Sequence, residues 1–330
     1  MKTCKKQALA ILGGYVVGLA LAGFAAPREI PFTGTALATW VSFGTALDDG
    51  THLLILNARA SAVLTASDAR VGGAGTITCS GVWHTNKVGL SWGSFHLSNA
   101  GGAWDGYWHG TNSFENGHVI MFVSMTAEGS ARYQGLVLRC TGTAVDNGAI
   151  QCTGSIVLDG HGARPYYLKG LRVDRAINIK GIVLDPLTLR PTGTSGALAW
   201  IVIGGPGGEA SYLGRTTEEG LGLLDPVTGV CSMMGTAIPI SSEQRDVLRW
   251  VAHATTDLKR LVSTNLTSAV ITAEVHFAGG TGRFEDATGG FNGRVTELVS
   301  PTPGPSAFQN TFQYEAVGTI RFNGPVESRD

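Results

Sequence analysis

The chain has 330 residues, more than one ordinary β-domain needs and enough for two domains that each bury a core. It contains 47 glycines, about twice the usual share, and only 15% charged residues, so no long segment has the composition of a disordered tail. Lys and Arg total 24 against 25 for Asp and Glu, and no basic cluster follows the first six residues. This balance argues against nucleic acid as a partner.

The N-terminus has the pattern of a secretory signal peptide. Three lysines within the first six residues precede an apolar run over residues 8–26, which ends in small residues before Pro27. We therefore assign residues 1–26 to a signal peptide, with cleavage after either Ala22 or Ala25, and expect a secreted or periplasmic protein. The alternative is an uncleaved helix that anchors the protein in a membrane, since about 19 apolar residues approach the roughly 20 that span a bilayer. After cleavage no stable membrane span remains.

Four cysteines remain once Cys4 has left with the signal peptide, an even number that suits an oxidising compartment and predicts two disulfides. Strand-like segments flank the turn at residues 146–148, which has the composition of a β-hairpin turn. Cys140 and Cys152 would then lie opposite each other across the hairpin and form one disulfide. Cys79 and Cys231 would form the second. The wide spacing argues against a zinc site, and we expect no metal.

Short alternating or apolar segments recur about every ten residues between glycine-containing turns, which predicts an all-β protein. Residues 119–125 are apolar on both faces, as in a strand that is covered on two sides. Residues 271–277 alternate between apolar and polar, which is the pattern of a half-buried strand, and residues 247–254 also favour a strand.

An internal repeat indicates duplication, because residues 129–135 are echoed by residues 280–286 about 150 positions later. We interpret the chain as two tandem antiparallel β-barrel-like modules that follow the signal peptide. The predicted divisions are module 1 at 31–162, a connecting segment at 163–193, module 2 at 194–322 and a C-terminal tail at 323–330.

The motif Gly-Gly-Thr-Gly-Arg-Phe at residues 279–284, followed by Ala-Thr-Gly at 287–289, resembles secreted bacterial proteins of the allene oxide cyclase and dirigent type of β-barrel. Residues 208–215 and 225–229 resemble the earlier turns of the same pattern, so the resemblance covers about 130 residues of the second module. It implies a barrel with a central cavity. The acidic, tyrosine and arginine residues that act in the plant enzymes have no matching positions here.

Residues 104–109 are the richest candidate site in the first module. On a strand, Trp104 and Trp108 share one face, while Asp105, Tyr107 and His109 share the other. The three polar residues are candidates for acid, base and proton donor, and the tryptophans for a ligand platform. In the alternative interpretation, the tryptophans fill the barrel and the polar face meets water.

In the second module, Glu274 and His276 share a strand face and are candidates for an acid–base pair, although we expect that face to be exposed to solvent. Arg283 and its counterpart Arg132 follow glycine turns and are candidate ligand-binding residues at a barrel rim. The glycine turn is not a phosphate site, because it leads into a strand and not into a helix N-terminus.

Three functions fit these observations, none of which requires a cofactor. The expected one is a non-enzymatic exported barrel that binds a small apolar ligand or an envelope component. The alternatives are a cofactor-free isomerase or cyclase of the allene oxide cyclase or dirigent type, and a purely structural surface module. An apolar cavity would favour binding, whereas a buried carboxylate beside Tyr or His would favour chemistry.

Overall fold

The computed structural model describes residues 29–323 except 147, 159–161, 205–207, 226–227, 241–245, 256–267 and 300–306. The signal peptide predicted at residues 1–26 and the alternative membrane anchor lie outside the described residues, as does the predicted tail beyond Asn323. Within the described part, no helix is both long enough and apolar enough to cross a membrane.

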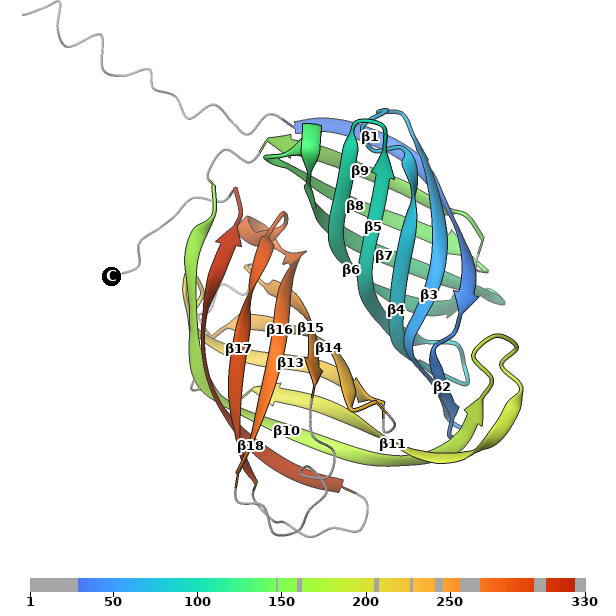
Figure 1. Ribbon diagram of the computed structural model, residues 1–330, viewed down its shortest axis with the longest axis vertical. Helices are drawn as coiled ribbons and strands as arrows, with labels where there is room; N and C mark the ends of the chain where they lie inside the picture. The colour runs from blue at the N-terminus through green and yellow to red at the C-terminus, as the bar shows by residue number, and fades with distance from the viewer. Residues whose placement is uncertain are drawn as a thin grey trace, which may run out of the picture.

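The first of two barrels is formed by eight antiparallel strands in which sequence neighbours pair, and β1 closes it by pairing with both β3 and β9. In Figure 1 it occupies the blue to green part of the chain. A short strand, β2 (Thr45–Asp48), leads into β3, and the turn η1 (Ala131–Tyr133) precedes β8. The eight strands are β1 (Glu29–Ser42), β3 (His52–Ala66), β4 (Gly73–His84), β5 (Gly89–Asn99), β6 (Gly102–Glu115), β7 (His118–Gly129), β8 (Leu136–Val145) and β9 (Ile150–Leu158).

The second barrel also has eight main strands and is closed by β10, which pairs with β11 and β18. These two closed barrels confirm the predicted all-β, tandem-module fold. The strands are β10 (Arg164–Leu184), β11 (Pro191–Gly204), β13 (Gly214–Leu224), β14 (Val230–Pro239), β15 (Leu248–Thr255), β16 (Ser268–Gly280), β17 (Thr288–Val299) and β18 (Ala307–Arg321), with a short β12 (Gly208–Ala210) and the turn η2 (Gly282–Phe284).

The boundary of the second barrel differs from the predicted one. Residues 163–193 contain β10 and the start of β11, so the second barrel begins near Arg164 and not at Thr194. The prolines of this segment lie where strands tolerate them: Pro165 is the second residue of β10, and Pro186 lies in the turn before β11.

Local alternation predicted the strands well but not always their burial. In β16, Ala273, Val275 and Phe277 are buried while Glu274 is exposed, as predicted, and residues 248–255 form β15. Residues 119–125 lie in β7, but the prediction that both faces are covered was wrong, since Phe122 is 47% exposed. A single-layered barrel has only one interior face, and the outer face of β7 is open at this position.

The predicted repeat corresponds to equivalent turns. β7 leads through η1 into β8, and β16 leads through η2 into β17. Ala131 and Gly282 occupy matching positions, and both have a positive φ, 54° and 60°. The aromatic side chain two residues later, Tyr133 or Phe284, is buried in the core of its barrel.

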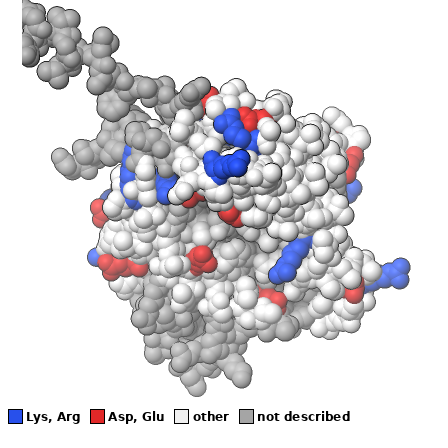
Figure 2. Space-filling model, turned by 45° about the horizontal axis from the view of Figure 1, so that its top comes forward, with Lys and Arg blue, Asp and Glu red and all other residues white. Residues whose placement is uncertain are grey.

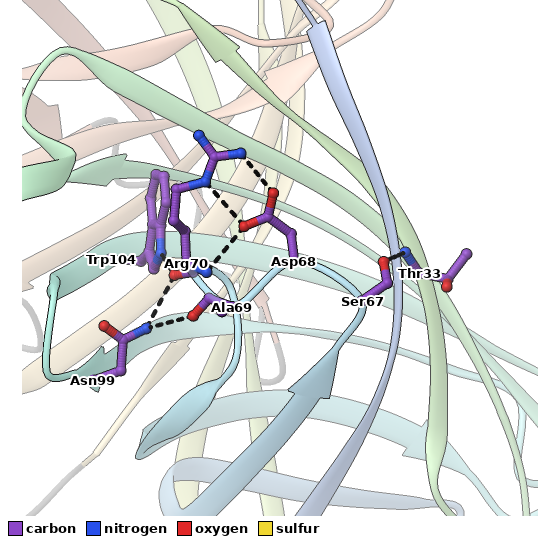
Figure 3. Close-up of polar contacts among 7 residues, drawn as sticks. All are labelled: Thr33, Ser67, Asp68, Ala69, Arg70, Asn99 and Trp104. Carbon is purple, nitrogen blue, oxygen red and sulfur yellow. Dashed lines mark hydrogen bonds and ion pairs between the residues drawn. The ribbon is translucent and has the colours of Figure 1, made fainter.

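One end of the first barrel is filled by the β3–β4 turn (Figure 3). Val71 in this turn is fully buried, and the guanidinium of Arg70 folds back onto the Asp68 carboxylate. Asn99 Nδ2 donates to the carbonyl oxygens of Ala69, Arg70 and Gly72 at 3.2, 3.1 and 2.7 Å. The indole of Trp104 donates to the Arg70 carbonyl at 2.8 Å. These bonds satisfy the turn's backbone and hold it in the end of the barrel.

The two barrels pack through their outer faces. Trp92 on β5 is fully buried, and its Nε1 donates to Ser232 Oγ on β14 at 2.9 Å. Two ion pairs, Arg139 with Glu285 and Arg321 with Glu128, join the barrels at 3.0 Å each. Trp92 belongs to an apolar cluster drawn from both barrels, which includes Leu47, Leu54, Leu56, Leu223, Val251 and Ala278.

A hairpin of the second barrel also reaches the first. The C-terminal end of β10, residues 182–184, pairs with β2 at residues 46–48, and the amide of Phe43 donates to the Pro186 carbonyl. Figure 1 shows this β10–β11 hairpin extending past its own barrel to lie beside β2. The second barrel therefore supplies part of the first barrel's surroundings.

The substitution Asn99→Ala tests the turn that fills the end of the barrel. It removes three donated hydrogen bonds and two that Oδ1 accepts, from the Gly101 amide and from Tyr133 Oη. We therefore expect the free energy of unfolding to fall by about 3 to 5 kcal/mol, since each such bond contributes about 1 kcal/mol. Urea titration followed by tryptophan fluorescence measures the change. Ser98→Ala, at the neighbouring exposed position, is the control, and an equal effect of both substitutions would contradict this role of Asn99.

Candidate functional site

The interior of the first barrel holds a cavity of about 720 Å³. Most of its polar lining residues lie at the end opposite the filling turn. His52 and His84 are paired across β3 and β4 there, and Lys87 follows in the β4–β5 turn. The cavity is therefore a one-ended pocket with a polar mouth.

The cavity exists because the inward side chains of two adjacent strands are small. β1 contributes Ala36 and Ala38, and β3 contributes Ala58, Ala60 and Ala62. The register pairs Ala38 with Ala62 and places these alanines side by side. The interior of an eight-stranded barrel is just wide enough to be filled by ordinary side chains or to hold one small ligand. A wall of alanines leaves that space open.

A β-bulge produces this row of alanines. Asn57 has a φ of 58°, and the pairing of β3 with β4 shifts between Ile55 and Ala58. Because of the extra residue, Ile55 and Ala58 both line the cavity although they are three positions apart. The amide of Asn57 donates to Ser80 Oγ at 3.1 Å, which holds the bulge. The alternation of apolar and polar residues could not reveal this wall. The one signal in the sequence was the residue type of Asn57, since Asn adopts a left-handed backbone conformation more readily than most residues.

The rest of the wall is aromatic, aliphatic and sulfur-containing. Trp108 Nε1 donates to the Thr78 carbonyl at 3.0 Å, so the polar atom of the indole is satisfied by the barrel wall. Leu189, from the β10–β11 hairpin, reaches the cavity from the second barrel. Other apolar lining residues include Ile77, Trp83, Phe95, Met121, Val123 and Met125.

The structure brings Trp108 to the cavity but not the other three predicted ligand-binding residues. Trp104 is fully buried at the filled end, where it stacks on Tyr133 with ring centroids 5.2 Å apart. Arg132 is exposed on η1. Arg283 pairs with Asp246 at 3.0 Å and braces a turn of the second barrel.

The predicted catalytic residues lie outside the cavity. Asp105, Tyr107 and His109 share the outer face of β6, as predicted, but this face turns toward the second barrel and not only toward water. Asp105 is exposed and pairs with His96 at 2.7 Å. Burial raises the pKa of Tyr107, whose ring stacks on His276 of β16 at a centroid distance of 4.2 Å.

Glu274 Oε1 and His276 Nε2 lie 3.0 Å apart and form the predicted pair. Both side chains were predicted to be exposed to solvent, but only one of them is. Glu274 is exposed, whereas the second barrel's His276 is largely covered by the first barrel. Burial lowers the pKa of His276 despite the Glu274 carboxylate, and burial together with His276 lowers the pKa of His253. Their lowered pKa values favour the neutral imidazoles of His253 and His276 in this interface, and neither residue lines the cavity of the first barrel.

His109 has the most strongly shifted pKa among the histidines of this interface. Its Nε2 is buried and has no hydrogen-bond partner among the described residues. Burial, with a smaller contribution from the charge of Arg249, lowers its pKa to about 4. The neutral imidazole is thus the form that fits the interface.

The His109 pKa predicts acid sensitivity. An unfolded His titrates near pH 6.5, whereas His109 in the folded chain has a pKa of about 4. As the pH falls from about 6.5 to about 4, the unfolded chain binds a proton at this position and the folded chain does not. The free energy of unfolding therefore falls over this range. We expect His109→Gln to lose less stability than the wild type over this range in urea titrations. His118→Gln, at an exposed site on β7, is the control. An unchanged pH dependence in His109→Gln would contradict the prediction.

The predicted disulfides do not form: Cys79, Cys140, Cys152 and Cys231 are all buried, and none of them is bonded to another cysteine. The hairpin register is the first reason: Cys140 pairs with Gly154, and Cys152 pairs with Gly142, so the two are diagonal neighbours. The second reason is topology, because Cys79 lines the cavity of the first barrel while Cys231 lies in the core of the second.

Aromatic side chains fill much of the second barrel, and the buried carboxylate of Glu218 lies among them. Glu218 is 5% exposed and accepts a hydrogen bond from Tyr314 Oη at 3.3 Å. Burial, with smaller contributions from Glu218 and Tyr314, raises the pKa of Tyr166. Local pattern offers no reason to choose Glu218 over the adjacent Glu219, since only barrel closure decides which of them faces inward.

Comparison of the chain with protein-family models, with curated proteins and with solved structures found no match. The function is therefore inferred from the cavity and from the side chains around it.

Proposed function

We propose that this is an exported, non-enzymatic β-barrel protein that binds a small apolar ligand in the cavity of the first barrel. The observation that supports it is the cavity of about 720 Å³ with its wall of alanine, aromatic and methionine side chains. Ligand pockets of drug-sized molecules have about this volume and are mostly apolar. Eight-stranded barrels that enclose one small ligand use the same geometry.

The polar groups of the cavity favour an amphiphilic form of such a ligand. Asn112 Oδ1 is buried and has no hydrogen-bond partner among the described residues, and Asn112 lines the cavity. An unpaired buried oxygen costs stability, which a donor on the ligand would recover. A hydroxyl group near Asn112, with an apolar tail toward the alanine wall, satisfies both parts of the cavity.

The outer surface gives less support for a charged partner. Figure 2 shows acidic and basic side chains scattered over the viewed face, with most of that face uncharged. This distribution agrees with the near balance of 24 basic and 25 acidic residues. An interior ligand is therefore favoured over recognition of a polyanion by the surface.

Filling the cavity tests the proposal. Ala60→Trp places an indole in the alanine wall, and we expect it to weaken binding of the fluorescent apolar probe N-phenyl-1-naphthylamine at least tenfold. Ser61→Trp is the matched control, because the neighbouring side chain on β3 is exposed on the opposite face. Circular dichroism checks that both variants fold.

Two results would count against this function. If the wild type binds no probe, and native mass spectrometry of the protein from its own source shows no copurified molecule, a structural surface module becomes the better explanation. If Ala60→Trp binds the probe as well as Ser61→Trp does, the ligand site lies elsewhere.

A cofactor-free isomerase is the second candidate, favoured by Glu218 in the second barrel. A buried carboxylate beside tyrosines is an arrangement suited to proton transfer. If it acts as a base, the protein should exchange the acidic carbon-bound hydrogens of small cyclic enones for deuterium in D₂O, and Glu218→Gln should abolish the exchange. Glu219→Gln is the control. NMR measures the rate, and no exchange above the buffer rate would exclude this candidate.

A further inference from the structure

Two histidines lie side by side at the mouth of the cavity in the first barrel. His52, at the start of β3, pairs in register with His84, at the end of β4, and both side chains line the cavity. Their rings meet edge to face with centroids 5.2 Å apart. Asn112 lies at the same end of the barrel, because Gly89 pairs with Trp83 on one side and with Asn112 on the other. A ligand that fills the cavity therefore has one end beside this histidine pair.

The turn before β3 fixes the tautomer of His52. The Asp49 carboxylate accepts from the amides of Thr51 and His52 at 2.8 and 2.6 Å, and its second oxygen lies 3.3 Å from His52 Nδ1. An ionised carboxylate only accepts hydrogen bonds, so Nδ1 of His52 carries the proton. In the neutral imidazole, Nε2 of His52 is then an acceptor.

The β4–β5 turn fixes the opposite tautomer in His84. The backbone amide of Asn86 donates to His84 Nδ1 at 3.4 Å, and the Thr85 hydroxyl lies 3.3 Å from the same nitrogen. A backbone amide only donates, so Nδ1 of His84 is the acceptor and Nε2 carries the proton. Neither Nε2 has a hydrogen-bond partner among the described residues. The mouth thus presents an acceptor on His52 beside a donor on His84.

The charges at the mouth argue against a charged head group on the ligand. Apart from the histidines, Asp48 and Lys87 are the only ionisable side chains of opposite charge among the described residues that line the cavity, and their charges balance. Asp48 Oδ1 accepts from the Gly50 amide at 2.8 Å, and the Lys87 ammonium lies 5.3 Å from the centre of the Phe114 ring. A carboxylate only accepts hydrogen bonds and an ammonium only donates them, so neither matches the histidine pair.

We infer that the cavity selects single-chain amphiphiles with a hydroxyl head group, the class of the long-chain primary alcohols. The hydroxyl oxygen accepts from Nε2 of His84, and the hydroxyl proton is donated to Nε2 of His52. The hydrocarbon chain lies along the alanine wall at Ala58 and Ala60. This inference rests on the proposed function, because the chain must first enter the apolar cavity, and it names the head group that the mouth recognises.

Two isomeric ligands test the donated hydrogen bond. 1-Decanol and 1-methoxynonane have the same formula, but only the alcohol can donate. Displacement of N-phenyl-1-naphthylamine from the full chain measures both affinities, at pH 8 because histidine side chains are mostly neutral there. We expect the alcohol to bind about five- to tenfold more tightly, since one hydrogen bond is lost with the ether. A purely apolar pocket would instead favour the ether, which is less strongly hydrated.

Substitutions assign the two roles. His52→Ala removes the acceptor and should abolish most of the preference for the alcohol over the ether. His84→Ala removes a donor that both ligands use and should weaken both. His118→Ala is the matched control, because His118 also contacts a carboxylate through Nδ1, that of Asp146 at 2.6 Å, but is exposed and does not line the cavity. It should leave both affinities unchanged, and circular dichroism checks that each variant folds.

The outcomes separate this inference from the proposed function. If the wild type binds the ether as tightly as the alcohol, or binds decanoate more tightly than either, hydroxyl recognition is overturned and apolar binding stands. An unchanged preference in His52→Ala also overturns it, as does a probe that neither isomer displaces. A wild type that does not bind the probe at all overturns the proposed function as well.

Discussion

Closure of an eight-stranded sheet fixes the width of its interior, and the size of the inward side chains then decides whether that interior is filled. The two barrels of this chain differ in the size of these inward side chains. The first lines part of its wall with Ala58, Ala60 and Ala62 and keeps a cavity, whereas the second places Trp250 and Phe277 in its core. We therefore propose ligand binding in the first barrel. Proton transfer by the buried carboxylate of Glu218 is the second candidate and concerns the second barrel.

Packing of one barrel on the other changes what several residues do. Tyr107 and His276 lie on outer strand faces that a single barrel would expose to water, yet they stack on each other in the interface. The same packing removes His109 from solvent and makes its neutral form the stable one. It also brings Leu189 of the β10–β11 hairpin to the cavity, so the pocket of the first barrel is completed by the second.

The strands and repeated turns, which depend on local pattern, were found as predicted, whereas the burial of both faces of residues 119–125 and the features set by strand register were not. The alternation of residues 273–277 and the repeated turns at Tyr133 and Phe284 follow from neighbouring residues and were found as predicted. The Cys140–Cys152 disulfide failed because a two-residue offset in pairing cannot be read from the composition of a turn. The bulge at Asn57 was missed because one inserted residue reverses the alternation on which the prediction depends.

By itself, the sequence determined that the chain is all-β, that it is duplicated and that strand 104–109 has an apolar and a polar face, because these properties follow from side-chain periodicity along short segments. Only the tertiary structure decided that the polar face of this strand packs on a second barrel, that residues 164–184 close that barrel, and that alanines and a pair of histidines line one cavity. These features join residues distant in sequence, and the register of closed strands, which sets them, has no local signal.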